Sequence, residues 1–246
     1  MSKWIRGICC LLGAWISTPA VATPLVADLS NYRVQVDSSF NGTRIFLFGA
    51  RNDNGDIVVV VRGPSKNYMV RKKERIAGMW VNRERMKFFN VPDFYITASS
   101  RPMYEIPEYG VFEQLSIGKT HLLSPPGGQH DPSRFEEFSN AFINFQERKK
   151  LYSGQNIPIS FMAETLFKTV IEFPDNIPPG KYAAEIYLLS DGNVVGMQST
   201  PITVQKAGLD AIIYNYAHNH PALYGLTAVI LALSAGWFGG RLFGKN

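Results

Sequence analysis

The chain has 246 residues, with 25 Lys and Arg, 20 Asp and Glu, and two cysteines. Four of the basic residues and both cysteines lie near the ends, so the part between keeps 21 basic residues, 20 acidic residues and no cysteine. A nearly neutral middle argues against nucleic acid as a partner. Without cysteine, that part has no disulfides, thiolate metal sites or cysteine nucleophiles.

Residues 1–22 are predicted to be a signal peptide. Lys3 and Arg6 precede the apolar run Gly7–Ile16, and Ala20-Val21-Ala22 supplies small residues before the expected cleavage point. A ten-residue helix reaches only about 15 Å, half of a ~30 Å hydrocarbon core. The alternative is a short anchor that stays on the protein.

Residues 23–105 are predicted to form an N-terminal β-rich domain. Asn54-Gly55 indicates a hairpin turn before Asp56–Gly63, which is apolar on both faces and therefore typical of a strand buried inside a sandwich. The longer predicted strands are Tyr32–Val36, Thr43–Ala50, Asp56–Gly63 and Phe94–Ser99, and the shorter ones are Asn67–Lys72, Met79–Asn82 and Met86–Asn90.

The segment Arg62–Lys87 has an unusual charge, with nine basic and two acidic residues. One interpretation is a docking face for an anionic lipid headgroup, an acidic protein or an oxyanion. The alternative is a solvated hairpin with Trp80 in the core. The contact candidates are Arg71, Lys72, Lys73, Arg75, Trp80, Asn82, Arg83 and Arg85.

Residues 106–156 are predicted to be a helical connector, partly helical over Tyr109–Leu123, with a loop at Ser124–Gly128. A longer helix is expected to follow, because Asp131 suits the N-cap and Pro132 the first helical turn. Its aromatic residues recur on one side, which predicts a stripe that packs in the core. That stripe consists of Phe135, Phe138, Phe142 and Phe145.

Residues 157–206 resemble the last strands of an immunoglobulin-like sandwich, with Pro178-Pro179-Gly180 before a strand and Asp191-Gly192 as a turn. Only about four strands fit, so either the module is small or strands from the first half complete it. The predicted fold is mainly β: an immunoglobulin-like β-sandwich region with an inserted amphipathic helix, and one C-terminal transmembrane helix.

Residues 207–221 are predicted to be a juxtamembrane amphipathic helix and residues 222–240 a transmembrane helix. The uncharged stretch is about 28 Å long as a helix. Arg241 and Lys245 follow it, so the tail, residues 241–246, is expected in the cytoplasm and the β region outside. Small residues recur every fourth position and suit close helix packing, with a second copy or another membrane protein. They are Ala228, Ala232, Gly236 and Gly240.

Three familiar catalytic patterns are missing from the sequence: Gly-x-Ser-x-Gly, His-Glu-x-x-His and a phosphate loop. We expect no enzymatic activity, no cofactor and no metal site. A hydrolase built on carboxylates that the fold brings together remains an alternative.

The motifs RIFLFGA, VVVVRGP, RKKERIAGMWVN, VPDFYITASSRP, PPGKYAAEIYLL and AHNHPALYGLTAVILALSAGW occur in this order. With them the chain resembles the alphaproteobacterial putative transmembrane protein family. The resemblance implies a periplasmic β-rich part and one span in the inner membrane of a Gram-negative bacterium. It also implies genes beside exporters of the sulfite/taurine type. It supplies no catalytic residues.

We therefore expect a non-catalytic accessory or assembly partner of an inner-membrane protein, with an anion (sulfite-type) exporter as one candidate. The expected contacts are that protein and the lipid bilayer, and a homodimer through the transmembrane helix is a further expectation. The first alternative is a periplasmic module that binds or senses anions, and the second is an unrecognised periplasmic hydrolase.

Overall fold

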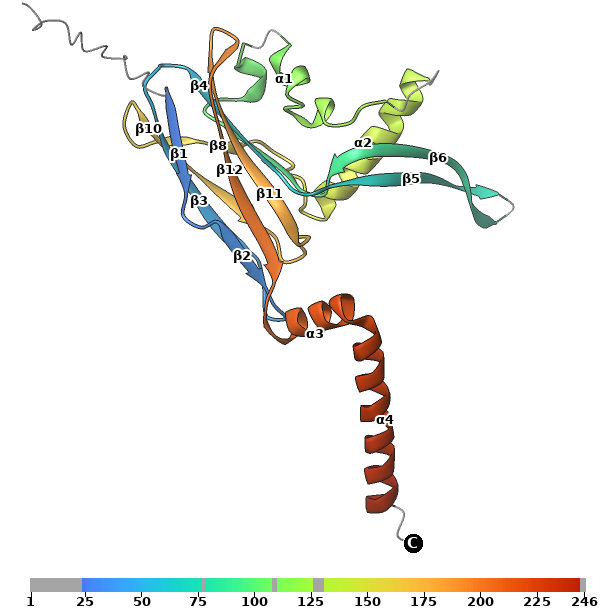
Figure 1. Cartoon of the computed structure of the whole chain (residues 1–246). Helices are drawn as coiled ribbons and strands as arrows, with labels where there is room; N and C mark the ends of the chain where they lie inside the picture. Colours follow the sequence, from blue (N-terminus) through green and yellow to red (C-terminus); the bar gives the residue numbers. More distant parts are fainter. Residues whose placement is uncertain (1–23, 77, 108–109, 126–130, 244–246) are drawn as a thin grey trace, which may run out of the picture.

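The computed structural model describes residues 24–76, 78–107, 110–125 and 131–243. It consists mostly of strands in three sheets, with several helices and one long apolar helix at the C-terminus (Figure 1). The predicted signal peptide lies outside the described residues, as do part of the predicted loop Ser124–Gly128 and the last three residues of the predicted tail.

A four-stranded antiparallel sheet forms one side of the body. Its strands lie in the order β1 (Leu25–Leu29), β3 (Thr43–Arg51), β10 (Leu166–Phe173) and β9 (Ser160–Phe161). Burial alternates along β1 and β10, as the two-residue period of a strand requires. The sequence predictions missed β1.

The six-stranded sheet has the order β2 (Arg33–Val36), β12 (Asn193–Lys206), β11 (Gly180–Ser190), β4 (Asp56–Arg62), β7 (Tyr95–Ser99) and β8 (Ile157–Pro158). The outermost strands, β2 and β8, run parallel to their neighbours, and the inner pairs are antiparallel. This sheet contains the strands predicted at Tyr32–Val36, Asp56–Gly63 and Phe94–Ser99.

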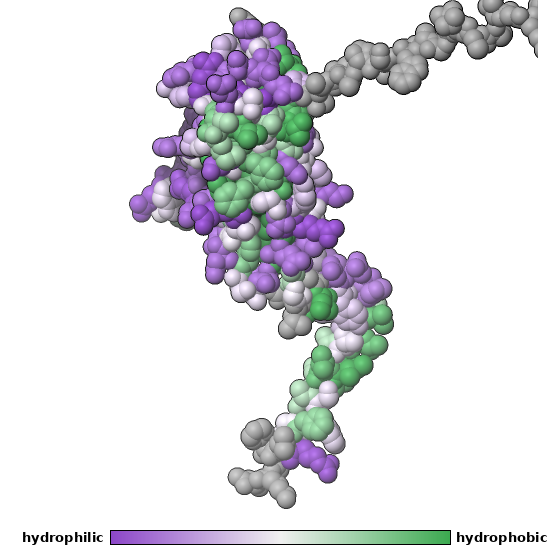
Figure 2. Space-filling model, turned by 90° about the vertical axis from the view of Figure 1, so that its left-hand side faces the viewer, coloured by the Kyte–Doolittle hydropathy of each residue, from purple (hydrophilic) through white to green (hydrophobic). Residues whose placement is uncertain are grey.

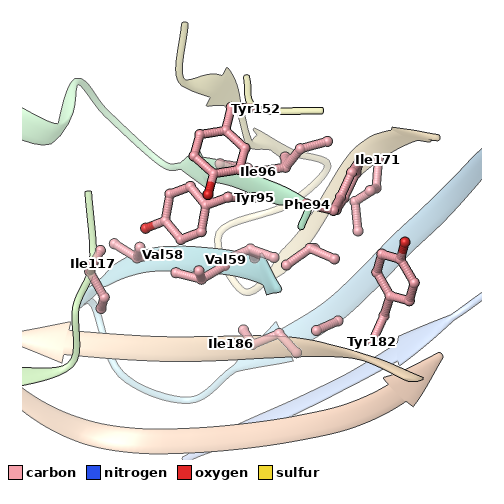
Figure 3. Close-up of a cluster of buried hydrophobic side chains, with 14 of the residues drawn as sticks. Val58, Val59, Phe94, Tyr95, Ile96, Ile117, Tyr152, Ile171, Tyr182 and Ile186 are labelled. Atoms are coloured by element: carbon pink, nitrogen blue, oxygen red, sulfur yellow. The ribbon is translucent and has the colours of Figure 1, made fainter. Parts of the chain in front are cut away.

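Both sheets mix strands from the two predicted β segments, since β3 pairs with β10 and β4 pairs with β11. The first half therefore completes the second, which decides between the two alternatives left open by the sequence. The sheets share one core, in which the ring of Phe173 stacks on Phe94 at 5.2 Å and meets Tyr182 edge-on at 5.8 Å. Figure 3 shows other side chains of this core, among them Phe94, Ile171 and Tyr182.

The outer face of the six-stranded sheet is covered by the connector η1 (Met103–Glu105), α1 (Val111–Gln114) and η2 (Lys119–His121). Val58 and Val60 on β4 are buried, as is Ile117 in the connector, which lies beside Val58 in Figure 3. The prediction that Asp56–Gly63 is buried on both faces is thus confirmed over Ile57–Val61. The connector is partly helical, as predicted.

Helix α2 (Pro132–Arg148) begins where the sequence predicts, because the Asp131 side chain accepts a hydrogen bond of 3.0 Å from the Ser133 amide. Phe138 and Phe142 are buried, but Phe145 is 45% exposed and the Lys149 ammonium lies 4.4 Å above its ring. The prediction of a continuous core stripe was therefore wrong for Phe145, which lies beyond the surface that α2 covers.

Two helices end the chain, α3 (Gly208–Asn219) and α4 (Pro221–Phe243). They fall at the predicted juxtamembrane and transmembrane segments. Among the described residues, α4 alone is long and apolar enough to cross a membrane, and its apolar stretch is not buried against the rest of the chain. Figure 1 shows it leaving one end of the β body.

Candidate docking surface

The basic segment forms a long two-stranded hairpin of β5 (Ser65–Ile76) and β6 (Met79–Pro92), which projects from the body (Figure 1). The prediction of separate short strands at Asn67–Lys72, Met79–Asn82 and Met86–Asn90 was wrong, because β6 runs without a break through its charged centre. Side chains that project on both sides into solvent do not interrupt backbone pairing.

The hairpin continues the pairing of β4 with β7. The Gly63 amide donates to the Phe94 carbonyl at 2.9 Å and the Asp93 amide donates to the Pro64 carbonyl at 2.8 Å. A Cβ at Gly63 would lie 2.9 Å from the Phe94 Cβ, closer than side chains pack. Glycine thus allows the ladder of β4 and β7 to continue without a break into β5 and β6. This continuity fixes the base of the hairpin, which we call its root.

A buried carboxylate holds this root. Asp93 is 1% exposed, accepts a hydrogen bond from the Tyr68 hydroxyl and forms an ion pair with Lys66. Desolvation, and then the hydrogen bond to Asp93, raise the pKa of Tyr68, so this hydroxyl stays a donor. The Tyr152 hydroxyl donates to the Pro92 carbonyl at 2.7 Å and joins the root to the segment after α2.

Helix α2 covers one face of the hairpin near the root. The ring of Phe142 lies 4.9 Å from that of Tyr68 and 5.8 Å from that of Phe88. Such aromatic pairs contribute about 0.5–1.5 kcal/mol each beyond their buried area. Farther out, Lys72 pairs with Glu137 of α2 at 2.5 Å, and this hydrogen bond raises the pKa of Lys72. Helix and hairpin therefore pack as one unit.

The register divides the charged side chains of the hairpin between two faces. Arg71 is paired with Arg85, Lys73 with Asn82 and Arg75 with Trp80, and alternation along β5 puts all three pairs on the face turned away from α2. We call this surface, together with Lys87, the outer face of the hairpin. A bulge beside Lys72 takes up the extra residue of β6.

The acids lie on the other face. Glu74 pairs with Arg83 at 2.9 Å, and Glu84 pairs with Arg134 of α2 at 3.1 Å. Two predicted contact residues, Lys72 and Arg83, are thus engaged within the chain. The other six predicted residues share the exposed outer face.

The cations of the outer face form no ion pair with any carboxylate in the described part of the chain. Arg75 donates to the Gly78 carbonyl at 3.4 Å, and Arg71 contacts the sulfur of Met69 at 3.7 Å. Like charges placed directly opposite in a ladder are unfavourable. An anionic ligand or surface would remove this repulsion, so its binding would be favourable.

Trp80 is 68% exposed, as is Met79 beside it at the tip. The alternative of a solvated hairpin was therefore wrong in placing Trp80 in the core, although the hairpin itself and its outward-facing charges are as it predicted. A two-stranded ribbon has no second layer at its tip, so an indole placed there contacts solvent or a partner. Exposed Trp next to Arg is a combination enriched where interfaces carry most binding energy.

The predicted packing residues of the membrane helix lie along α4 as expected from their spacing. Ala228, Ala232, Gly236 and Gly240 are all exposed, and a Cβ at Gly236 or Gly240 would meet no atom within 4 Å among the described residues. The surface is free for another helix, and helix packing here stays a prediction.

An open groove of ≈ 800 Å³ lies between β10 and the C-terminal end of α2 with the segment that follows it. The sequence predictions missed this groove. Its lining includes Glu147, Glu172 and Asp175, of which Glu147 forms an ion pair with Lys119. Among the described residues no three His, Cys, Asp or Glu side chains come together as metal ligands. The hydrolase alternative stays a prediction.

A second unpredicted surface lies on the outer face of the four-stranded sheet. Large apolar side chains are exposed there, and Figure 2 shows a hydrophobic area on this side of the body. The motif RIFLFGA is apolar at almost every position and gives no sign of which residues are uncovered. The exposed residues are Val26, Phe46, Phe48, Met162 and Leu166.

Comparison with known proteins gives little beyond the family. No curated protein matches the chain. A solved structure titled "Structural basis of T cell specificity and activation by the bacterial superantigen toxic shock syndrome toxin-1" aligns with 9% identity over 74% of this chain and 99% of that chain. Its TM-score of 0.27 is too low to carry an argument. The family model described as putative transmembrane protein (Alph_Pro_TM) matches residues 24–245, and the chain belongs to that family.

Proposed function

We propose that this protein is a non-catalytic, membrane-anchored periplasmic partner that assists or assembles with an inner-membrane protein, and that the outer face of the hairpin docks on it. The observation that carries the proposal is the set of outer-face cations, Arg71, Lys73, Arg75, Arg85 and Lys87, without a carboxylate partner among the described residues. The expected complement is an acidic surface.

Charge of this kind acts mainly on encounter and orientation. A basic strip steers an acidic partner and raises its association rate, and like charges exclude other proteins. The exposed Trp80 and Met79 then supply apolar contact at the tip. The acids of the hairpin are held on the opposite face by Arg83 and Arg134, so they do not weaken the field of the outer face.

The anchor makes a weak contact sufficient. We place α4 across the inner membrane with Arg241 at the cytoplasmic side, following the positive-inside rule, and the β body in the periplasm as an immunoglobulin-like sandwich. Two proteins held in one membrane have a high effective concentration, so little affinity is needed. An anion exporter of the sulfite type is the candidate partner that the family resemblance suggests.

A second candidate function is anion binding or sensing by the hairpin itself, because Arg71 and Arg85 lie directly opposite each other. Two guanidinium groups can together bind an oxyanion. Calorimetry with sulfite, sulfate, phosphate and taurine tests this idea. Heat at millimolar ligand that disappears in Arg85→Ala supports it, and no heat removes it.

The docking proposal is tested by a photoreactive residue at position 80 in the full-length protein in native membranes. We expect a discrete adduct with one membrane protein. Arg71→Glu/Arg85→Glu should remove the adduct, and Lys181→Glu, an exposed change on β11, should leave it intact. Adducts with lipid alone, or no adduct, would overturn the proposal.

A further inference from the structure

The outer face of the four-stranded sheet carries an apolar area that the described residues leave uncovered. Phe46 and Phe48 on β3 are 49% and 44% exposed. Val26 and Leu166 lie on either side of Ala50, in the row of the sheet next to Phe48. A shallow apolar hollow beside them is lined by Val26, Phe48, Leu166 and Met162, among others. Contiguous apolar areas of this kind on a folded domain mark interaction sites.

Charged side chains border the apolar area in two rows across the sheet. Phe48 is paired with Asp28 of β1 on one side and with Lys168 of β10 on the other, so the three residues form one row across the sheet. The next charged row pairs Arg44 with Glu172. Each row is therefore neutral, and the row of Phe48 has one sign on each side of the ring. Asp28 accepts hydrogen bonds from the Tyr32 hydroxyl and the Leu29 amide, but neither Asp28 nor Lys168 has an ion-pair partner among the described residues.

A row of this kind complements itself. If a second copy faces this sheet across a twofold axis that runs along β3, Asp28 of one copy meets Lys168 of the other, and Phe48 meets Phe48. Arg44 of the two copies also meets on this axis, each beside its own Glu172. Isologous twofold contacts are the commonest way for identical chains to associate. A partner of strongly basic or acidic character would leave one of the two charges unpaired.

The position of the face also limits its occupant. The hydrophobic area lies on the side of the body, above α4, and not on the end from which α4 leaves (Figures 1 and 2). Lipid around α4 does not lie against it. A second copy in the same membrane presents the same face at the same height. β3 begins near the end of the body from which α3 and α4 leave and runs away from it, so a twofold axis along β3 keeps both α4 helices inserted from one side.

From these observations we propose that the chain forms a homodimer through the outer face of its four-stranded sheet, with Phe48 at the twofold axis and reciprocal Asp28–Lys168 ion pairs. The hairpins project from the opposite side of each body, so they stay accessible at the two far ends of the dimer (Figure 1).

Disulfide crosslinking in native membranes tests the contact at the axis. The full-length Phe48→Cys variant should give a covalent dimer under mild oxidation, because the same residue from both copies meets there. Lys181→Cys on β11 and the unmodified chain are the controls, and both should stay monomeric on denaturing gels. A yield from Phe48→Cys no higher than that of the controls, or a crosslink to a different protein, would overturn the proposal.

Charge exchange between two differently tagged copies tests the pairing itself, with Phe48→Cys present in each. Asp28→Lys alone and Lys168→Asp alone place like charges opposite each other twice, so each should lose most of the crosslink. Coexpressed, the two variants restore both ion pairs, and the mixed dimer should return to the parent level. A mixed dimer as weak as either single variant, alongside a normal circular dichroism spectrum of both, would contradict the arrangement.

The proposed homodimer does not depend on the docking role of the hairpin. A crosslink at position 48 without an adduct at position 80 would support the homodimer and contradict the docking proposal. An adduct at position 80 without a crosslink at position 48 would support the docking proposal and contradict the homodimer.

Discussion

Strands β3 and β4 lie in different sheets of one body and both carry long apolar runs, but their outer sides have different surroundings. Outside β4, the connector supplies Phe112 and Ile117, and Val58 and Val60 are fully buried. Outside β3, the described chain supplies no cover and Phe46 and Phe48 remain exposed. The same kind of sequence thus produces a core in one place and an exposed apolar surface in the other.

The difference follows from where the connector can reach. Residues 102–123 follow β7 directly, and β7 pairs with β4, so the chain turns back over the nearest face. Arg62 at the end of β4 fixes it there by donating to the Leu115 carbonyl at 2.7 Å and the Ser116 carbonyl at 3.0 Å. Among the described residues, no segment next to the four-stranded sheet in the sequence turns back over its outer face, since β3 leads through a short turn into β4 and β10 leads into β11.

The covered side gives the largest expected effect. Ile117→Ala removes a side chain that is 0% exposed and leaves a cavity over Val58. We expect a loss of about 2–5 kcal/mol in the free energy of unfolding. Denaturant unfolding of the full-length protein in detergent, followed by circular dichroism, measures it. A loss below about 1 kcal/mol would mean that the connector is only loosely attached.

Arg62 is expected to have the next largest effect. Arg62→Ala breaks its ion pair with Glu185 and both hydrogen bonds to the connector, and it leaves a partly buried carboxylate without its partner. Hydrogen bonds of charged groups contribute about 1.5–3 kcal/mol, so we expect a loss of that order. Amide exchange should rise first at residues 111–123. Unchanged protection there would show that packing alone holds the connector.

A substitution of Asp131, the N-cap of α2, tests the stability of the helix that covers the hairpin. The expected effect on protein stability is smaller. The hydrogen bonds from Ser133, its side chain first, lower the pKa of Asp131 below the ordinary value of 3.8. This stabilisation is therefore present above pH 3.8 and disappears as the pH falls through the lower pKa of the folded state. Asp131→Ala should lower the thermal midpoint slightly at pH 7 and should not matter at strongly acid pH. Equal effects at both pH values would contradict the cap.

The uncovered side gives the smallest expected effect on folding. Phe48→Ser removes an exposed ring, and surface substitutions usually change the free energy of unfolding by within about 0.5 kcal/mol. The measurement is denaturant unfolding in dilute detergent, where copies are separated. A large loss would show that Phe48 is part of the monomer core. The same variant should weaken association in membranes, which makes the contrast with Ile117 complete.

Local chemistry was read correctly from the sequence at several points. Asp131 and Pro132 predicted the start of α2, because a cap depends only on its own turn. Asp56–Gly63 predicted a strand buried on both sides, and 222–240 predicted the long apolar helix. The charge of the basic segment indicated the surface that the structure exposes. It did not decide whether Trp80 is buried or exposed.

Other features needed the tertiary structure. Whether Lys72 or Arg71 is free depends on which strand face meets α2, and this is fixed by the register and the bulge of the hairpin. The exposed state of Phe48 depends on where a connector from elsewhere in the chain happens to lie.

The sequence by itself determined the elements whose causes are local: the membrane helix from length and apolarity, the start of α2 from its cap, and the charge of the hairpin from composition. Only the tertiary structure decided that two β segments form one body, which cations lack partners, and which apolar face stays open. The joining of the two β segments depends on pairings between residues more than 100 positions apart, β3 with β10 and β4 with β11, and no local pattern encodes them. The other two features depend on where α2 packs against the hairpin and where the connector packs against β4.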